Sequence, residues 1–298
     1  MRSRSSSTAV SAKVFEVKAP RAELRASLRS GIVALESLLK RPGFGLGKHT
    51  VGLELELFLV DEQERAKSVG RDVAKLANCP SITPEIGLFD IELSTEPVTL
   101  AGTPFSLLGA NLRNVEAKVQ ECAAKVGARA VPVSVLPTLR REDFGPQIIT
   151  DLPRYRAIAR GMRRARRAPF QIDIAGDDPL RMSTDDAAME GANAGFQVHL
   201  SVNPDDFASF FNAAQMLTGP VMAASGNSPF FLGHRLWEET RIALFKQAGD
   251  DRPIDAQAQF RLPARIGFGT GWVREGAIEL FAESVALHEP LLLQCGEE

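Results

Sequence analysis

The sequence predicts an α+β fold in which helices pack on the apolar face of a sheet and acidic side chains line its other face. Three short segments, 52–57, 89–96 and 196–202, alternate apolar and polar residues. Side chains of a β-strand point alternately to its two faces, so this alternation indicates strands. Residues 104–126 carry apolar side chains at steps of three and four, which predicts the helix that covers the apolar face.

Carboxylates dominate the polar positions of the three predicted strands. Glu54 and Glu56 alternate with leucines in the first, Glu92 follows Asp90 in the second, and His199 lies on the polar side of the third. If the strands share a sheet, like charges meet on one face and repel unless cations lie among them. Oxygen-rich walls of this kind suit Mg²⁺ or Mn²⁺. We therefore predict that Glu54, Glu56 and Glu92 converge on one or more divalent cations.

A solvated sheet face is the alternative interpretation, because an antiparallel sheet with one wet side alternates in the same way. Such faces usually mix basic and neutral polar residues with their acids. The three segments contain neither lysine nor arginine. This composition favours the metal-binding face.

The remaining elements follow from local signals along the chain. Residues 22–40 form a predicted helix that ends at Arg41-Pro42-Gly43, and the glycine-rich loop 42–47 is a connector because it precedes a strand rather than opening a helix. Strands are expected near 50–61, 87–97 and 130–136. A further helix is expected near 204–218, followed by a loop at 225–230.

The helix over 104–126 has the clearest signals in the chain. Thr103 precedes Pro104, which is a common start for a helix, and Gly127 follows its last apolar residue. Its apolar stripe includes Phe105, Leu108, Leu112 and Val115, and is completed by Val119, Cys122 and Val126. We expect this stripe to pack on the leucine-bearing face of the sheet.

Composition limits the class of protein. The chain has 298 residues, 44% of them hydrophobic and 24% charged, with a formal net charge of −2. These values are typical of a globular protein and argue against nucleic acid as a partner. No apolar run is long enough to span a membrane, so no membrane partner is expected. Residues 1–20, with a polar and basic start, are expected to be a disordered tail, and 21–298 a single domain.

The three cysteines are widely scattered and odd in number. This pattern favours a reducing, cytoplasmic location without a disulfide framework.

A basic cluster occupies residues 154–167. It contains seven arginines: Arg154, Arg156, Arg160, Arg163, Arg164, Arg166 and Arg167. A solvated basic helix, an anion site for a nucleotide or acidic substrate, and a nucleic-acid surface are the three interpretations. The overall charge and the scarcity of aromatic residues within the cluster argue against the last.

Five segments together resemble the glutamate–cysteine ligase family 2, the carboxylate–amine ligases. They are 51–58, 84–97, 195–200, 226–230 and 239–244, and their order and spacing match the family from about residue 21 to the end. The resemblance implies a curved, largely antiparallel sheet that forms a funnel with helices on its outer face, related to the catalytic domain of glutamine synthetase. It also implies a ligase that uses ATP and Mg²⁺ to join glutamate to cysteine or another amine through an acyl phosphate, the first step of glutathione synthesis when the amine is cysteine.

The resemblance also assigns roles to residues. Glu54 and Glu56 match the family's metal-binding pair on the first strand, Glu85 and Glu92 match acidic positions on the second segment, and His199 matches the metal-site histidine. Imidazole is an unusual ligand for Mg²⁺, and a hydrogen-bonding or core histidine is the alternative for His199.

Two further residues are expected at the nucleotide and substrate. Asn227 belongs to the Asn-Ser-Pro loop, and Arg241, the one expected catalytic residue, follows it. A guanidinium there suits phosphate or a substrate carboxylate. A surface ion pair with Glu238 or Glu239 is the alternative for Arg241.

The C-terminal region departs from the family pattern. Family members carry a further strand with another metal-binding glutamate near the C-terminus, and no convincing counterpart follows Leu291. The sequence therefore predicts a C-terminally incomplete catalytic domain. A non-catalytic remnant, or a subunit that needs a second chain such as another copy of itself, stays open beside the ligase.

Overall fold

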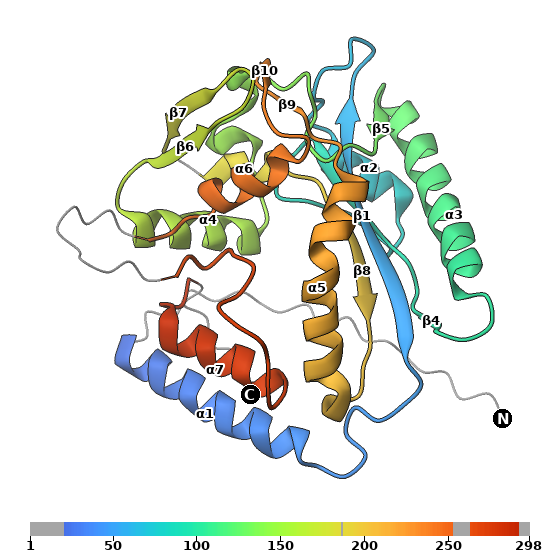
Figure 1. The fold of residues 1–298 in the computed structure, drawn as a ribbon. Helices are drawn as coiled ribbons and strands as arrows, with labels where there is room; N and C mark the ends of the chain where they lie inside the picture. Colours follow the sequence, from blue (N-terminus) through green and yellow to red (C-terminus); the bar gives the residue numbers. More distant parts are fainter. Residues whose placement is uncertain (1–20, 186, 253–262, 292–298) are drawn as a thin grey trace.

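One long central strand, β1 (Thr50–Val60), organises the fold (Figure 1). The structure is a computed structural model that describes residues 21–185, 187–252 and 263–291. It mixes helices with antiparallel sheets, so the predicted α+β class is confirmed. β1 forms antiparallel pairs with four strands: β3 (Asp90–Ser94), β4 (Val98–Thr99), β5 (Arg129–Val131) and β8 (Phe196–Leu200). β2 (Ile82–Pro84) extends this sheet beyond β3.

The register of β1 decides which side chains become neighbours. Glu56 lies opposite Glu92 of β3, and Glu54 lies opposite Gln197 of β8. Residues directly opposite in an antiparallel pair share a face of the sheet. The predicted polar face therefore forms from three strands, and β1 is its centre.

The leucine side of the sheet is covered by two helices, α2 (Gly70–Ala77) and α3 (Pro104–Lys125). Leu57 and Leu59 are fully buried there with Val119. The expectation that helix 104–126 packs on the leucine face is thus confirmed. It fails at the first turn, where Phe105 is 72% exposed. That turn lies beside the two-residue strand β4, which offers little surface for packing.

The opposite side of β1 is not polar along its whole length. Phe58 and Val60 point to the carboxylate side and are fully buried in a second hydrophobic core. This core is formed largely by elements that the sequence did not predict: β6 (Phe170–Ile174), β7 (Leu180–Thr184), β9 (Phe230–Phe231), the 3-10 helix Ala187–Ala192 and α6 (Thr240–Ala248). β10 (His234–Arg235) pairs with β9. The carboxylates therefore occupy only one half of their face.

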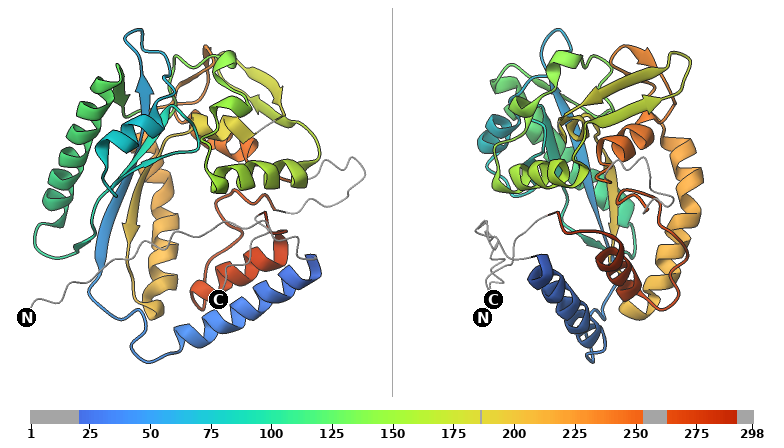
Figure 2. Two further views of the ribbon diagram at one scale, coloured as in Figure 1. Left: turned by 180° about the vertical axis from the view of Figure 1, so that it is seen from behind. Right: turned by 90° about the vertical axis from the view of Figure 1, so that its left-hand side faces the viewer.

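Four more helices complete the described fold: α1 (Arg21–Leu39), α4 (Pro153–Arg166), α5 (Phe207–Ser225) and α7 (Ala277–Leu287). α1 and α7 lie side by side (Figure 1). Figure 2 (right) shows α5 and α2 on opposite sides of the central strands, so helices are not confined to one face. α1 confirms the predicted helix 22–40, and α5 continues past the predicted end at 218.

Three predicted boundaries need correction. The strand expected over 130–136 is only β5, because Pro132 lacks the N–H that a continuing ladder needs. The strand expected over 87–97 covers only Asp90–Ser94. Thr103 makes no side-chain hydrogen bond to the start of α3. The expected disordered tail, 1–20, lies outside the described residues.

Among the helices that the structure describes, none has both the length and the apolar character that crossing a membrane requires.

Candidate functional site

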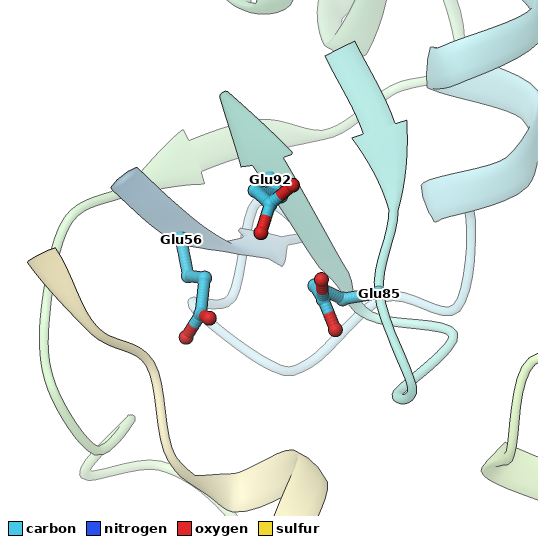
Figure 3. Close-up of side chains that lie close together, drawn as sticks. All are labelled: Glu56, Glu85 and Glu92. Atoms are coloured by element: carbon cyan, nitrogen blue, oxygen red, sulfur yellow. The ribbon is translucent and has the colours of Figure 1, made fainter. Parts of the chain in front are cut away.

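Three glutamates bring carboxylate oxygens within 4.8 Å of one another (Figure 3). Glu56 comes from β1, Glu92 from β3 and Glu85 from the loop after β2. The pairing of Glu56 with Glu92 across β1 and β3 sets two of them side by side, and the return from β2 toward β3 brings in the third. We call these three residues the glutamate trio.

Each carboxylate of the trio is held by a hydrogen bond from a neighbour. The N–H of Gly195 donates to Glu56 Oε2 at 2.6 Å. The hydroxyl of Thr83 donates to Glu92 Oε1 at 3.1 Å. Glu85 Oε2 accepts from the N–H of Ile86 at 3.0 Å and from the Tyr155 hydroxyl at 3.3 Å. These bonds fix the directions of the three side chains.

Burial and repulsion disfavour the charged form of Glu56, Glu92 and Glu190. Burial, then the charge of Glu85, raises the pKa of Glu56 to about 8, although the Gly195 N–H acts in the opposite direction. The same two causes raise the pKa of Glu92. They also raise the pKa of Glu190, on the 3-10 helix Ala187–Ala192, to about 7. The site therefore concentrates negative charge that it does not balance.

Asp90 adds a further buried carboxyl below the trio. Burial, then the charge of Glu56, raises the pKa of Asp90 well above its usual range. Its Oδ1 atom has no hydrogen-bond partner among the described residues.

The donor set fits a hard divalent cation. All three trio ligands are carboxylate oxygens, which Mg²⁺ and Mn²⁺ prefer over nitrogen or sulfur. A cation between them would replace repulsion by attraction and lower the pKa values that crowding raises.

Glu54 and His199 form a pair of their own next to the trio. His199 Nε2 lies 2.9 Å from Glu54 Oε2, and the imidazole is exposed. The sequence placed Glu54 with Glu56 and Glu92, but Glu85 takes that place in the structure. The reason is the register: Glu54 lies one pleat further along β1, beside β8, where it meets His199 rather than the trio. The metal role of both residues stays a prediction.

A cleft of about 510 Å³ opens beside the trio. Glu56 and Glu190 line it together with Arg241 and Lys246 of α6. Apolar side chains, including Phe268, complete its walls. The cleft thus combines cations with carboxylates, which suits ligands that carry anionic groups.

Arg241 is held in place by contacts within the chain. Its Nε donates to Glu239 Oε1 at 2.7 Å and its Nη1 donates to the carbonyl of Ala194 at 3.1 Å. The ion pair that the sequence left open as an alternative is therefore present, with Glu239 as the partner. Arg241 also lines the cleft, and its expected role at phosphate or a substrate carboxylate stays a prediction.

Asn227 lies away from the cleft lining. Its Oδ1 accepts the N–H of Ser134 at 3.0 Å, and its own N–H donates to Glu239 Oε2 at 3.4 Å. These bonds fix the loop that precedes α6. Its expected role at the nucleotide stays a prediction.

Sequence reasoning missed two neighbours of the trio and did not separate a third from its cluster. Glu190 lies in a short 3-10 helix without periodicity, so no pattern marked it. Tyr155 is the only tyrosine of the chain, but its contact with Glu85 depends on tertiary structure. Arg154 was one of seven arginines. Its guanidinium lies 4.5 Å from the Tyr155 ring centre, and its charge partly opposes the rise that burial causes in the pKa of Glu92.

An antiparallel sheet with converging carboxylates, next to a cleft lined by an arginine and a lysine, suits an enzyme that handles anionic substrates. The model of the glutamate-cysteine ligase family 2 (GCS2) matches residues 50–260, and the chain belongs to this family. This confirms the family that the sequence motifs predicted, and membership implies a ligase-type enzyme. A comparison with curated proteins found no match.

Proposed function

We propose that this protein is an ATP-dependent ligase that joins the γ-carboxylate of glutamate to the amine of cysteine. The observation that supports this most is the convergence of Glu56, Glu85 and Glu92 beside a cleft lined by Arg241. Family membership indicates a carboxylate–amine ligase. The product would be γ-glutamylcysteine, so the reaction would be the first step of glutathione synthesis. Under the same proposal the sheet is related to the catalytic domain of glutamine synthetase.

The proposed chemistry explains why carboxylates and cations line one cleft. Phosphorylation of a carboxylate by ATP brings together groups that are all anionic. The glutamate trio would hold Mg²⁺, or Mn²⁺, which when bound supplies positive charge to phosphate oxygens. Arg241 and Lys246 would bind anionic groups of the substrates that enter the cleft. Gly195 and Tyr155 keep the trio oriented through their hydrogen bonds.

The test is an assay of ADP release with Mg²⁺, ATP, glutamate and a panel of amines. We expect turnover with cysteine, and a loss of at least about a hundredfold for Glu85→Gln, the cost of removing one preorganised electrostatic group at a reacting phosphate. Glu62→Gln is the matched control, because Glu62 is an exposed glutamate in the turn after β1. Equal activity of Glu85→Gln and the wild type would contradict the site. Absence of ADP release with every amine would contradict the ligase.

The amine panel separates the two ligases that the sequence left open. Turnover with an amine other than cysteine would keep the carboxylate–amine ligase and replace only its second substrate. The same assay on the purified chain decides whether a second chain is needed, because activity that rises more steeply than protein concentration indicates assembly of the active form.

A further inference from the structure

The arginine cluster of residues 154–167 is only partly used by the candidate site. Arg154 lies near the trio, and Arg166 is buried, with an ion pair to Asp250 at 3.2 Å. Arg164 and Arg167, at the C-terminal end of α4, are exposed and do not line the cleft beside the trio. Both side chains line a separate cavity of about 390 Å³.

This cavity lies between four parts of the fold. Its lining comes from α1, from the end of α4, from the segments after α6 at 251–252 and 263–265, and from the end of α7 with the residues after it. None of its lining residues belongs to the cleft beside the trio. The packing around it is close: a Cβ atom at Gly161 of α4 would lie 2.6 Å from the carbonyl oxygen of Leu291. Five of its lining residues are arginines: Arg25, Arg164, Arg167, Arg252 and Arg265.

Two carboxylates also line the cavity, and both already have basic partners. Asp251 forms an ion pair with Arg265 at 2.8 Å, and Glu289 forms one with Arg25. Arg164 donates to the carbonyl of Leu291 at 3.0 Å, which is an uncharged acceptor. Arg252 is likewise paired, with Asp250 at 2.7 Å. The excess positive charge of the cavity therefore comes from Arg164 and Arg167.

Arg167 is the most available of these cations. Its side chain makes no hydrogen bond or ion pair with any residue that the structure describes, and it caps α4 in the left-handed conformation at φ 58°. His288 adds a polar group without adding charge, because burial, and then the charge of Arg265, lowers its pKa.

We propose that this arginine cavity binds a small molecule that carries a phosphate group. A planar guanidinium matches phosphate oxygens with paired hydrogen bonds, and several guanidiniums around one cavity favour a multiply charged anion. A volume of about 390 Å³ exceeds what one phosphate group fills and lies within the range of small-molecule sites. Apolar lining by Ala286, Leu287 and Pro290 would contact the remainder of the ligand. This site is additional to the proposed ligase site.

Pyrophosphate, titrated calorimetrically without Mg²⁺ and at constant ionic strength, is the probe. The test variant is the double substitution Arg164→Gln/Arg167→Gln, and both positions are exposed, so the fold should persist. Arg163→Gln is the matched control: Arg163 lies in the same helical turn, pairs with Asp185 at 3.5 Å and does not line the cavity. We expect the double variant to bind at least about tenfold more weakly, the factor for one lost charge-assisted hydrogen bond. The control should bind like the wild type.

Four outcomes would overturn the proposal. One is equal affinity of the double variant and the wild type, and another is an equal loss in Arg163→Gln, which would indicate a general charge effect. The third is abolition of pyrophosphate binding by Arg241→Gln alone, which would place the anion in the cleft beside the trio. Malonate serves as a dicarboxylate probe: binding of malonate but not pyrophosphate would also reject a phosphate site. Because no turnover is measured, failure of the ligase proposal would leave this test unaffected.

Discussion

Replacement of Glu56 by glutamine should change how stability depends on pH. Glu56 has an ordinary pKa of 4.5 in the unfolded chain and a pKa of about 8 in the folded protein. Between these values the folded state binds the proton more tightly than the unfolded state. The free energy of unfolding of the metal-free wild type should therefore fall as pH rises from about 5 to about 8. Glutamine is neutral at every pH and can still accept the N–H of Gly195.

The size of this effect follows from the two pKa values. Each tenfold change in proton affinity corresponds to 1.36 kcal/mol, so the rise from 4.5 to about 8 gives roughly 3 kcal/mol at pH 7 and between about 4 and 5 kcal/mol above pH 9. Asp90 also has a raised pKa and is present in both proteins. The charge of Glu56 contributes to that rise, so the difference between the variant and the wild type reports Glu56 together with its effect on Asp90.

The assay is urea unfolding followed by circular dichroism, in EDTA, at several pH values from 5 to 8.5. We expect the variant to gain stability over the wild type as pH rises, while Glu62→Gln follows the wild type at every pH. Mg²⁺ added at pH 8 should stabilise the wild type more than the variant, because a cation offsets the charge that the variant lacks. Parallel curves for Glu56→Gln and the wild type across this pH range would refute the reasoning.

Three other substitutions test the packing and the site. Leu108→Ala should lower the free energy of unfolding by about 2–5 kcal/mol, because Leu108 is 1% exposed. Leu107→Ala, at the neighbouring position that is 53% exposed, should change it by less than about 0.5 kcal/mol. Comparable losses in the two variants would show that α3 is placed wrongly. Gly87→Ala should cost about 1–3 kcal/mol, because its Cβ would lie 2.2 Å from Asp90 Oδ2, whereas Gly47→Ala meets no atom within 4 Å and should be neutral in the same denaturation assay. Tyr155→Phe removes the hydroxyl that donates to Glu85 and should weaken Mg²⁺ binding by about 10–100-fold, measured by calorimetry, with unchanged affinity as the contrary result.

The parts of the fold that the sequence predicted well depend on local periodicity. β1 and α3 each carry a long, regular pattern, and the pattern also predicted that the leucines of β1 face α3. Phe58 and Val60 continue the alternation of β1 on its carboxylate side. The core that they enter there is formed by residues far along the chain, so their local pattern did not predict what covers them.

The candidate site was predicted where it depends on strand parity and missed where it depends on tertiary structure. Glu56 and Glu92 share a face because both strands alternate, and the structure places them in one cluster. Glu85 stands on a loop, where alternation says nothing; only the family resemblance pointed to it. Glu54 has the right parity but lies outside the trio, where Glu85 takes the place expected for it. This outcome depends on the register between β1 and β8, which one sequence does not fix.

The central position of β1 has a consequence for the order in which the site forms during folding. The glutamate trio comes from segments near one another in the chain, which meet when the first strands pair. Gly195 and His199, by contrast, join Glu56 and Glu54 from 139 and 145 residues away. Contacts of such separation close large loops and form late. On the ribosome, the trio could assemble while β8 is still unsynthesised, leaving its negative charges without the Gly195 amide that later supports Glu56.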